Sequence, residues 1–156
     1  MKYFNSTESL YNLLKSSNFN QILNSTSIVL KGIKKIGKLD CNTSGAILCC
    51  VFIIDRKILC LNIGDLRCMI IENNKSKFIN SIHSITKEDE RMRILSFKNA
   101  LIERNPKTDC DEIFLRYSNK PSIKFTRCIG STFAYEIGVL NKPDIFEYDL
   151  VAHLFG

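Results

Sequence analysis

The residue best placed for chemistry is Asp65, which follows an apolar run ending at Ile63-Gly64. Gly64 suits a tight bend or the close approach of another group. Asp65 then carries a carboxylate away from the end of a sheet strand, where it is suited to binding a hard cation. Alternatively, Asp65 caps the bend or pairs with Arg67. The residues alone leave these roles open.

Seven cysteines and two histidines raise the question of disulfides or zinc. The odd cysteine count, the absence of Cys-x-x-Cys and the lack of an apolar signal segment after Met1 weigh against both. His83 and His153 are far apart and have no neighbouring cysteine. Four cysteines lie inside apolar, strand-like runs: Cys49, Cys50, Cys60 and Cys68. The sequence therefore predicts free, structural cysteines and no zinc centre.

The formal net charge of +6 suggests an acidic partner such as nucleic acid or phosphate. The lysines are scattered, however, and only the stretch KGIKKIGK from Lys31 to Lys38 is dense. It contains no aromatic residue for base stacking, so a solvated helix face is favoured and no nucleic-acid partner is expected. The alternative is a small, basic α+β binding domain that recognises anionic surfaces through this stretch in a salt-sensitive way.

Length and hydropathy fit one globular domain, because 156 residues with 45% hydrophobic side chains can bury a single core. The longest apolar run, Ala46 to Ile54, is far shorter than the ~20 residues of a spanning helix. We therefore expect an intracellular protein, cytoplasmic or nuclear, with no membrane partner.

The elements that must position Asp65 change character along the chain. Residues 1–40 have helical spacing, with a second helix from about Asn20 to Ile36. Residues 44–80 read as an antiparallel β-meander, with strands at 46–54, 58–63, 66–71 and 76–80. The first of these is continuously apolar, as in a strand covered on both faces. Asp55-Arg56-Lys57 forms its hairpin turn.

The remaining half alternates between helix and strand. Thr86-Lys87-Glu88-Asp89 has the form of a capping box and predicts a helix over residues 86–103, with acidic residues 88–90 in its first turn. A flap-like excursion covers 99–122 and contains a short strand at 112–117. Residues 123–150 contain a helical turn at Thr132–Ile137 and a final strand at Asp144–Tyr148. The fold class is α+β in a single domain, residues 1–156.

Three blocks of residues occur in a recognisable order. Ser44-Gly45-Ala46 leads through a hairpin into LNIGDLRCM; ITKEDERMRI opens a helix; and FTRCIGSTFAYEIGVLNKPDI precedes the last strand. These blocks resemble, in order and rough spacing, the Gly-Asp-Ser-Arg-Ala stretch, the acidic Arg-Ile block and the Ser-Arg-Ser-Ile-Gly-Asp signature of the protein phosphatase 2C family. The resemblance covers about residues 40 to 150.

This resemblance implies an antiparallel β-sandwich flanked by helices, here incomplete. It implies an enzyme that hydrolyses phosphoserine or phosphothreonine with Mg²⁺ or Mn²⁺, two ions activating the attacking water. In that family the aspartate matching Asp65 is associated with an additional, weaker metal position. The family's main ligand motifs, an Asp-Gly-His-Gly-like segment, a later Asp-Gly and a late Asp-Asn, do not occur in this chain. Asp65 is therefore the one predicted metal ligand, and no catalytic residue is assigned.

Two positions in the signature block bear on function. Ser131 replaces the family's aspartate and supplies no carboxylate. Arg127 matches the family's signature arginine, and we expect it to bond loop carbonyls rather than phosphate.

One carboxylate cannot hold two divalent ions, so we predict no appreciable phosphatase activity for this polypeptide alone. Either the chain is a fragment of an active phosphatase, as its ending at Gly156 before a family core strand suggests, or it is a degenerate pseudophosphatase. In the latter case it binds a phosphoprotein or another protein partner without catalysis, as Ser131 suggests. Open sheet edges would favour self-association.

Overall fold

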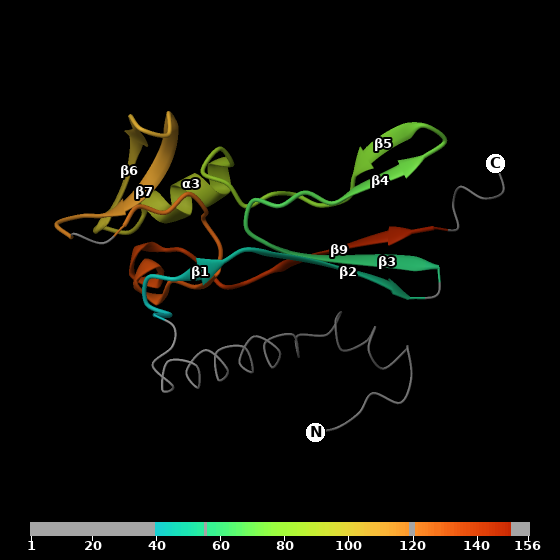
Figure 1. Ribbon diagram of the computed structural model, residues 1–156, viewed down its shortest axis with the longest axis horizontal. Coiled ribbons are helices and arrows are strands. Elements are labelled where there is room, and N and C mark those ends of the chain that lie inside the picture. The colour runs from blue at the N-terminus through green and yellow to red at the C-terminus, as the bar shows by residue number, and fades with distance from the viewer. Residues whose placement is uncertain (1–39, 55, 119–120, 151–156) are drawn as a thin grey trace, which may run out of the picture.

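The computed structural model describes residues 40–54, 56–118 and 121–150 (Figure 1). The helices predicted within 1–40, the Lys31–Lys38 stretch and His153 lie outside these residues. The described elements, in chain order, are β1 (Gly45–Ala46), β2 (Leu48–Ile54), β3 (Lys57–Ile63), β4 (Met69–Glu72), β5 (Lys75–Phe78), α3 (Glu88–Leu95), β6 (Ala100–Asn105), β7 (Cys110–Leu115), β8 (Ile129–Gly130), the 3₁₀ helix η1 (Thr132–Ile137) and β9 (Asp144–Asp149).

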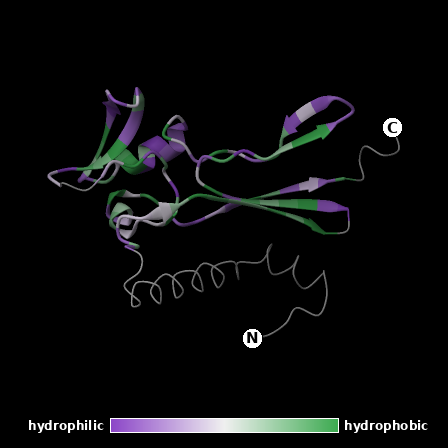
Figure 2. Cartoon of the chain, in the orientation of Figure 1, coloured by the Kyte–Doolittle hydropathy of each residue, from purple (hydrophilic) through white to green (hydrophobic). Residues whose placement is uncertain are grey.

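A three-stranded antiparallel sheet with the order β2-β3-β9 carries the Gly64-Asp65 bend. The central strand β3 is almost completely buried, and hydrophobic residues run along β2 and β3 (Figure 2). The predicted hairpin and final strand are confirmed. The expectation that residues 46–54 are covered on both faces is wrong, since Val51 and Ile53 are 47% and 70% exposed. In the described sheet, β2 is an edge strand, and β3 takes the central place.

The chain does not continue from β3 into the same sheet. β4 and β5 form a separate hairpin, whose turn residues Asn73 and Asn74 both have positive φ, the backbone typical of a tight two-residue turn. The continuous meander predicted over 44–80 is therefore wrong at Gly64, where the positive φ of 104° redirects the chain out of β3. The Asn80 side chain secures the redirected segment by bonding the Leu66 carbonyl and the Cys68 amide.

The helix predicted over 86–103 is correct only in its first half. α3 ends at Leu95, and residues from Ala100 onward pair with β7 as an antiparallel hairpin. Apolar spacing favoured a longer helix, but pairing with β7 overrides it. The predicted capping box does not form either: Lys87 holds the N-cap position without a side-chain bond, and the Thr86 hydroxyl donates to Ser84 Oγ instead.

A second apolar core lies where α3, the β6–β7 hairpin and η1 meet. Its buried members are Ile85, Ile94, Ala100, Ile113, Ile123, Cys128, Phe133, Ala134, Ile137 and Val139. Because this core joins α3 to the segment that follows Thr126, it fixes the helix relative to Arg127. The α+β class is thus as predicted.

The described cysteines are all free. Cys60 and Cys128 are buried, and burial raises the pKa of both thiols, that of Cys128 to about 11. Cys49 and Cys60 lie with their sulfurs 3.6 Å apart without a covalent bond. No helix in the described ranges is long and apolar enough to cross a membrane.

Candidate functional site

The bend at Gly64-Asp65 lies at the carboxyl end of β3. A Cβ on Gly64 would lie 2.3 Å from Ile47 Cγ2, and the positive φ also disfavours any other residue. Asp65 is exposed, and no described residue forms a hydrogen bond or ion pair with its carboxylate. Arg67 lies instead over the Phe78 ring, 5.2 Å from its centroid. The predicted alternative of an Asp65–Arg67 pair is therefore not formed, and the Asp65 carboxylate is accessible.

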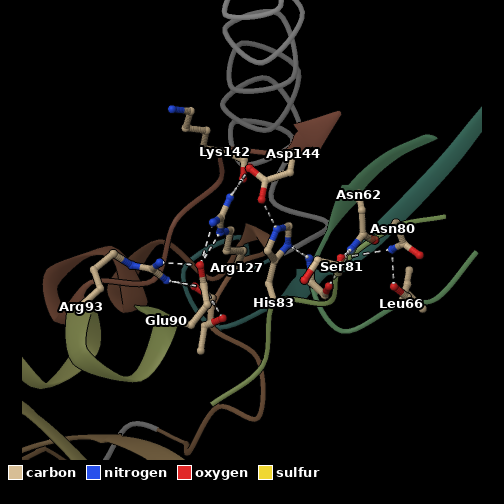
Figure 3. A network of polar contacts seen from close by, with 12 residues as sticks. Asn62, Leu66, Asn80, Ser81, His83, Glu90, Arg93, Arg127, Lys142 and Asp144 are labelled. Atoms are coloured by element: carbon tan, nitrogen blue, oxygen red, sulfur yellow. Dashed lines mark hydrogen bonds and ion pairs between the residues drawn. The ribbon is translucent and has the colours of Figure 1, made fainter. Parts of the chain in front are cut away.

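The Gly64 backbone is held on both sides by His83. The Gly64 amide donates to His83 Nδ1 at 3.0 Å, and the His83 amide donates to the Gly64 carbonyl at 3.1 Å. Asn62 Nδ2 donates to the same carbonyl at 3.0 Å. Because Nδ1 accepts a hydrogen bond, the imidazole proton is on Nε2, which donates to Asp144 Oδ2 at 3.0 Å. Figure 3 shows the His83 ring and its contact with Asp144.

Arg127 continues the chain of contacts from Asp144 into the interior. Its Nη1 donates to Asp144 Oδ1 at 2.9 Å and to the Lys142 carbonyl at 3.0 Å. Its Nε and Nη2 both donate to Glu90 Oε1, at 3.0 and 2.7 Å. The expected bond to a loop carbonyl is confirmed. The two carboxylate partners were not predicted, and they raise the pKa of Arg127 although burial alone would lower it.

Glu90 accepts more hydrogen bonds than Asp144, the other carboxylate that Arg127 contacts. Arg93 from the same helix donates to both of its oxygens at 2.7 Å, and the Thr126 hydroxyl donates to Oε2. Burial alone would raise the pKa of Glu90, but the bonds from Arg93, Arg127 and Thr126 outweigh it and lower the pKa to about 2. Glu90 is therefore ionised at neutral pH despite being buried.

These contacts form one network, defined here as the Glu90–His83 network: Arg93, Glu90, Arg127, Asp144 and His83 (Figure 3). Two carboxylates balance two guanidinium groups, and the imidazole that binds Gly64 is neutral. For Asp144, burial alone would raise the pKa of the carboxyl group. The hydrogen bonds from His83 and Arg127 outweigh this effect and lower the pKa. The network links α3, the 126–128 segment and β9 to the bend that presents Asp65.

The sequence contains one local signal for this network, in the spacing of residues along α3. Glu90 and Arg93 are three residues apart on α3, and the buried Ile94 follows directly. This spacing places the ion pair on the inward side of the helix. The helix dipole alone does not distinguish the buried Glu90 from the exposed Glu88 and Asp89.

A second buried carboxylate belongs to the β6–β7 hairpin. Glu112 accepts hydrogen bonds from Ser122, Thr108 and Asn105, and Lys124 lies 3.6 Å away. The hydrogen bonds from Ser122, Thr108 and Asn105 lower the pKa of Glu112 to about 2. Glu112 thus fastens the hairpin turn to the segment after Pro121 and has a structural role.

The described residues do not assemble a complete metal centre. No group of three or more His, Cys, Asp or Glu side chains in these ranges is close enough to hold an ion. Glu90 and Asp144 are both engaged by arginines. Ser131 is buried, with left-handed backbone, and its amide donates to the Ser44 carbonyl. Asp65 is therefore the carboxylate at this bend that is free to contact a cation.

Comparison with known proteins identifies the class. Residues 2–153 match the protein phosphatase 2C family, and the chain belongs to this family. The predicted alternative of an unrelated basic domain is therefore wrong. No curated protein sequence matches the chain significantly.

Two solved structures support the fold. A serine-threonine phosphatase 2C from Toxoplasma gondii is 14% identical, with a TM-score of 0.68 over 91% of this chain and 53% of that one. A C. elegans sex determining protein is 16% identical, with a TM-score of 0.55 over 80% of this chain and 27% of that one. The chain thus has a phosphatase 2C-like fold and spans about half the length of the Toxoplasma protein.

Proposed function

We propose that this chain is a phosphatase 2C-type unit that presents one accessory ligand, Asp65, to Mg²⁺ or Mn²⁺. The observation that carries the proposal is the Gly64-Asp65 bend, whose backbone His83 holds from both sides while the Asp65 carboxylate contacts no described residue. A rigid bend with a free carboxylate suits a hard cation, because little ordering is then required on binding. The family match supports the choice of these ions.

The same proposal includes a lack of turnover by this polypeptide alone. Hydrolysis of phosphoserine or phosphothreonine at a two-ion site needs several carboxylates around the ions. Within the described ranges, no group of three or more His, Cys, Asp or Glu side chains is placed to hold an ion, and Glu90 and Asp144 are both paired with Arg127. We therefore derive no hydrolytic step through these residues.

A phosphoprotein or another protein is the proposed partner. The remaining ligands come from outside this sequence, or the chain is a pseudophosphatase that binds its partner without catalysis. The buried Ser131, which offers a hydroxyl where the family has a carboxylate, favours the second possibility. Self-association remains a proposal, supported by the exposed apolar side chains of Val51 and Ile53 on the edge strand β2. The proposed location is the cytoplasm or nucleus.

The test is hydrolysis of a phosphoserine peptide with excess Mn²⁺ or Mg²⁺, comparing the unchanged chain with Asp65→Ala. Asp89→Ala is the matched control, since Asp89 is also exposed and lies away from the bend in the first turn of α3. We expect all three proteins to release phosphate at the background rate. Turnover that Asp65→Ala abolishes and Asp89→Ala preserves would overturn the proposed inactivity.

A further inference from the structure

A cavity of about 320 Å³ lies between the β4–β5 hairpin and the start of α3. Its lining includes two cations, Arg67 and Lys87, two hydroxyls, Ser81 and Thr86, and two apolar side chains, Phe78 and Ile82. No carboxylate lines it, and Asp65 is not part of it. The cavity is therefore separate from the proposed metal ligand and has one sign of charge.

Both cations are uncompensated within the described ranges. Arg67 is exposed and stacks on the Phe78 ring, and no carboxylate pairs with it. Stacking occupies the face of the guanidinium and leaves the N–H groups at its edge available for bidentate bonds. Lys87, also exposed, likewise has no ion-pair partner among the described residues. Two such cations around one hollow attract a dianion more strongly than either alone.

The neutral groups of the cavity fit the same ligand. The Asn80 side chain accepts from the Cys68 amide and donates to the Leu66 and Ser81 carbonyls, so it stiffens the wall next to Arg67. The Ser81 hydroxyl has no partner among the described residues and can donate to a phosphoryl oxygen. Phe78 is 54% exposed, which leaves ring surface for an apolar side chain of the ligand.

We propose that this cavity binds the phosphoryl group of a phosphorylated peptide, with Arg67 and Lys87 as its charge partners and Phe78 as the contact for a flanking apolar residue. Two oxygens of a tetrahedral phosphoryl group can accept the pair of parallel N–H bonds that the planar guanidinium donates from its edge. The cavity is within the size range of small-ligand sites. The choice of a phosphoprotein as the source of the phosphoryl group rests on the proposed function. The assignment of an anion site to this cavity does not depend on that function.

The experiment is a calorimetric titration of the full chain with a phosphoserine peptide that has a leucine beside the phosphoserine. The buffer is metal-free and contains EDTA. Inorganic phosphate and the unphosphorylated peptide are the comparison ligands. Because no metal is present, the result is independent of Asp65 and of any turnover. The variants are Arg67→Gln and Lys87→Gln, with Lys98→Gln as the control, since Lys98 is an exposed lysine outside the cavity.

We expect the phosphopeptide to bind, the unphosphorylated peptide not to bind, and each cavity variant to weaken binding about tenfold, the value of one charge-assisted hydrogen bond. Lys98→Gln should bind like the unchanged chain, and circular dichroism should show that every variant is folded. No binding of phosphopeptide or phosphate at millimolar concentration would overturn the proposal. Equal weakening by Lys98→Gln would do the same, since it would indicate a nonspecific charge effect. If inorganic phosphate binds and the phosphopeptide does not, the assignment of a phosphopeptide as the ligand is overturned.

Discussion

Replacing Glu90 by glutamine tests whether the Glu90–His83 network holds the domain together. The glutamine side chain has nearly the same volume, so the substitution removes the charge and leaves the packing in place. Five hydrogen bonds reach the carboxylate: two from Arg93, two from Arg127 and one from Thr126. In the variant, the guanidinium groups of Arg93 and Arg127 lose their shared counter-charge in a buried place.

The expected loss follows from two estimates that agree. Removing one partner of a buried ion pair costs about 3–5 kcal/mol. Independently, the pKa of Glu90 falls from 4.5 to about 2 on folding, and at about 1.4 kcal/mol per pKa unit this corresponds to about 3 kcal/mol. Since a domain of this kind has a total stability of about 5–15 kcal/mol, the loss is a large share of it.

Urea unfolding measures the loss directly. The chain has five tyrosines and no tryptophan, so tyrosine fluorescence and far-UV circular dichroism are the probes. Glu88→Gln is the matched control, because Glu88 lies in the same first turn of α3 but is exposed, and we expect it to cost under about 0.5 kcal/mol. If Glu90→Gln does not fold, Thr126→Val, which deletes one donor, should cost about 1–2 kcal/mol. Equal stabilities of Glu90→Gln and Glu88→Gln would refute the reasoning.

Three further variants and an acid titration extend the account. The free energy of unfolding should fall between about pH 4.5 and pH 2, because folding lowers the pKa values of both Glu90 and Glu112. Their contribution to stability is present above the unfolded pKa and is lost as the pH falls through about 2. Glu90→Gln should flatten this pH profile. Gly64→Ala should cost about 3 kcal/mol, from positive φ and the clash with Ile47, whereas Gly45→Ala, without a positive φ, should cost less. His83→Phe keeps a ring but unpairs the Gly64 amide, which should then exchange its hydrogen faster by NMR; an unchanged rate would exclude His83 as the clamp. Glu112→Gln should speed exchange in β7 while leaving β3 protected, and a uniform change in both strands would contradict its local role.

Much of the β-structure could be predicted because its signals are local. The hairpin of β2 and β3 and the strand β9 follow from apolar, β-branched runs bounded by turns. η1 was likewise predicted at its observed bounds. Asp65 could be named from its place after Gly64, and the structure leaves its carboxylate free of described partners, although metal binding there is still a prediction.

What could not be predicted depends on contacts between distant residues. The end of α3 at Leu95 is set by pairing of β6 with β7, which helical spacing cannot reveal. The Glu90–His83 network joins residues that are distant in the sequence; His83 and Asp144, for example, are 61 positions apart. Such long-range polar partners have no local pattern, so Arg127 could be recognised as structural while its two carboxylates could not.

The most direct test of the central claim, that this chain presents a single accessory metal ligand at the bend, is an NMR titration with Mn²⁺. Paramagnetic broadening identifies the amides near the bound ion. We predict weak binding, with broadening centred on Gly64, Asp65 and Leu66, that Asp65→Asn abolishes and Asp89→Asn leaves unchanged. Broadening centred elsewhere, or persisting in Asp65→Asn, would contradict the account.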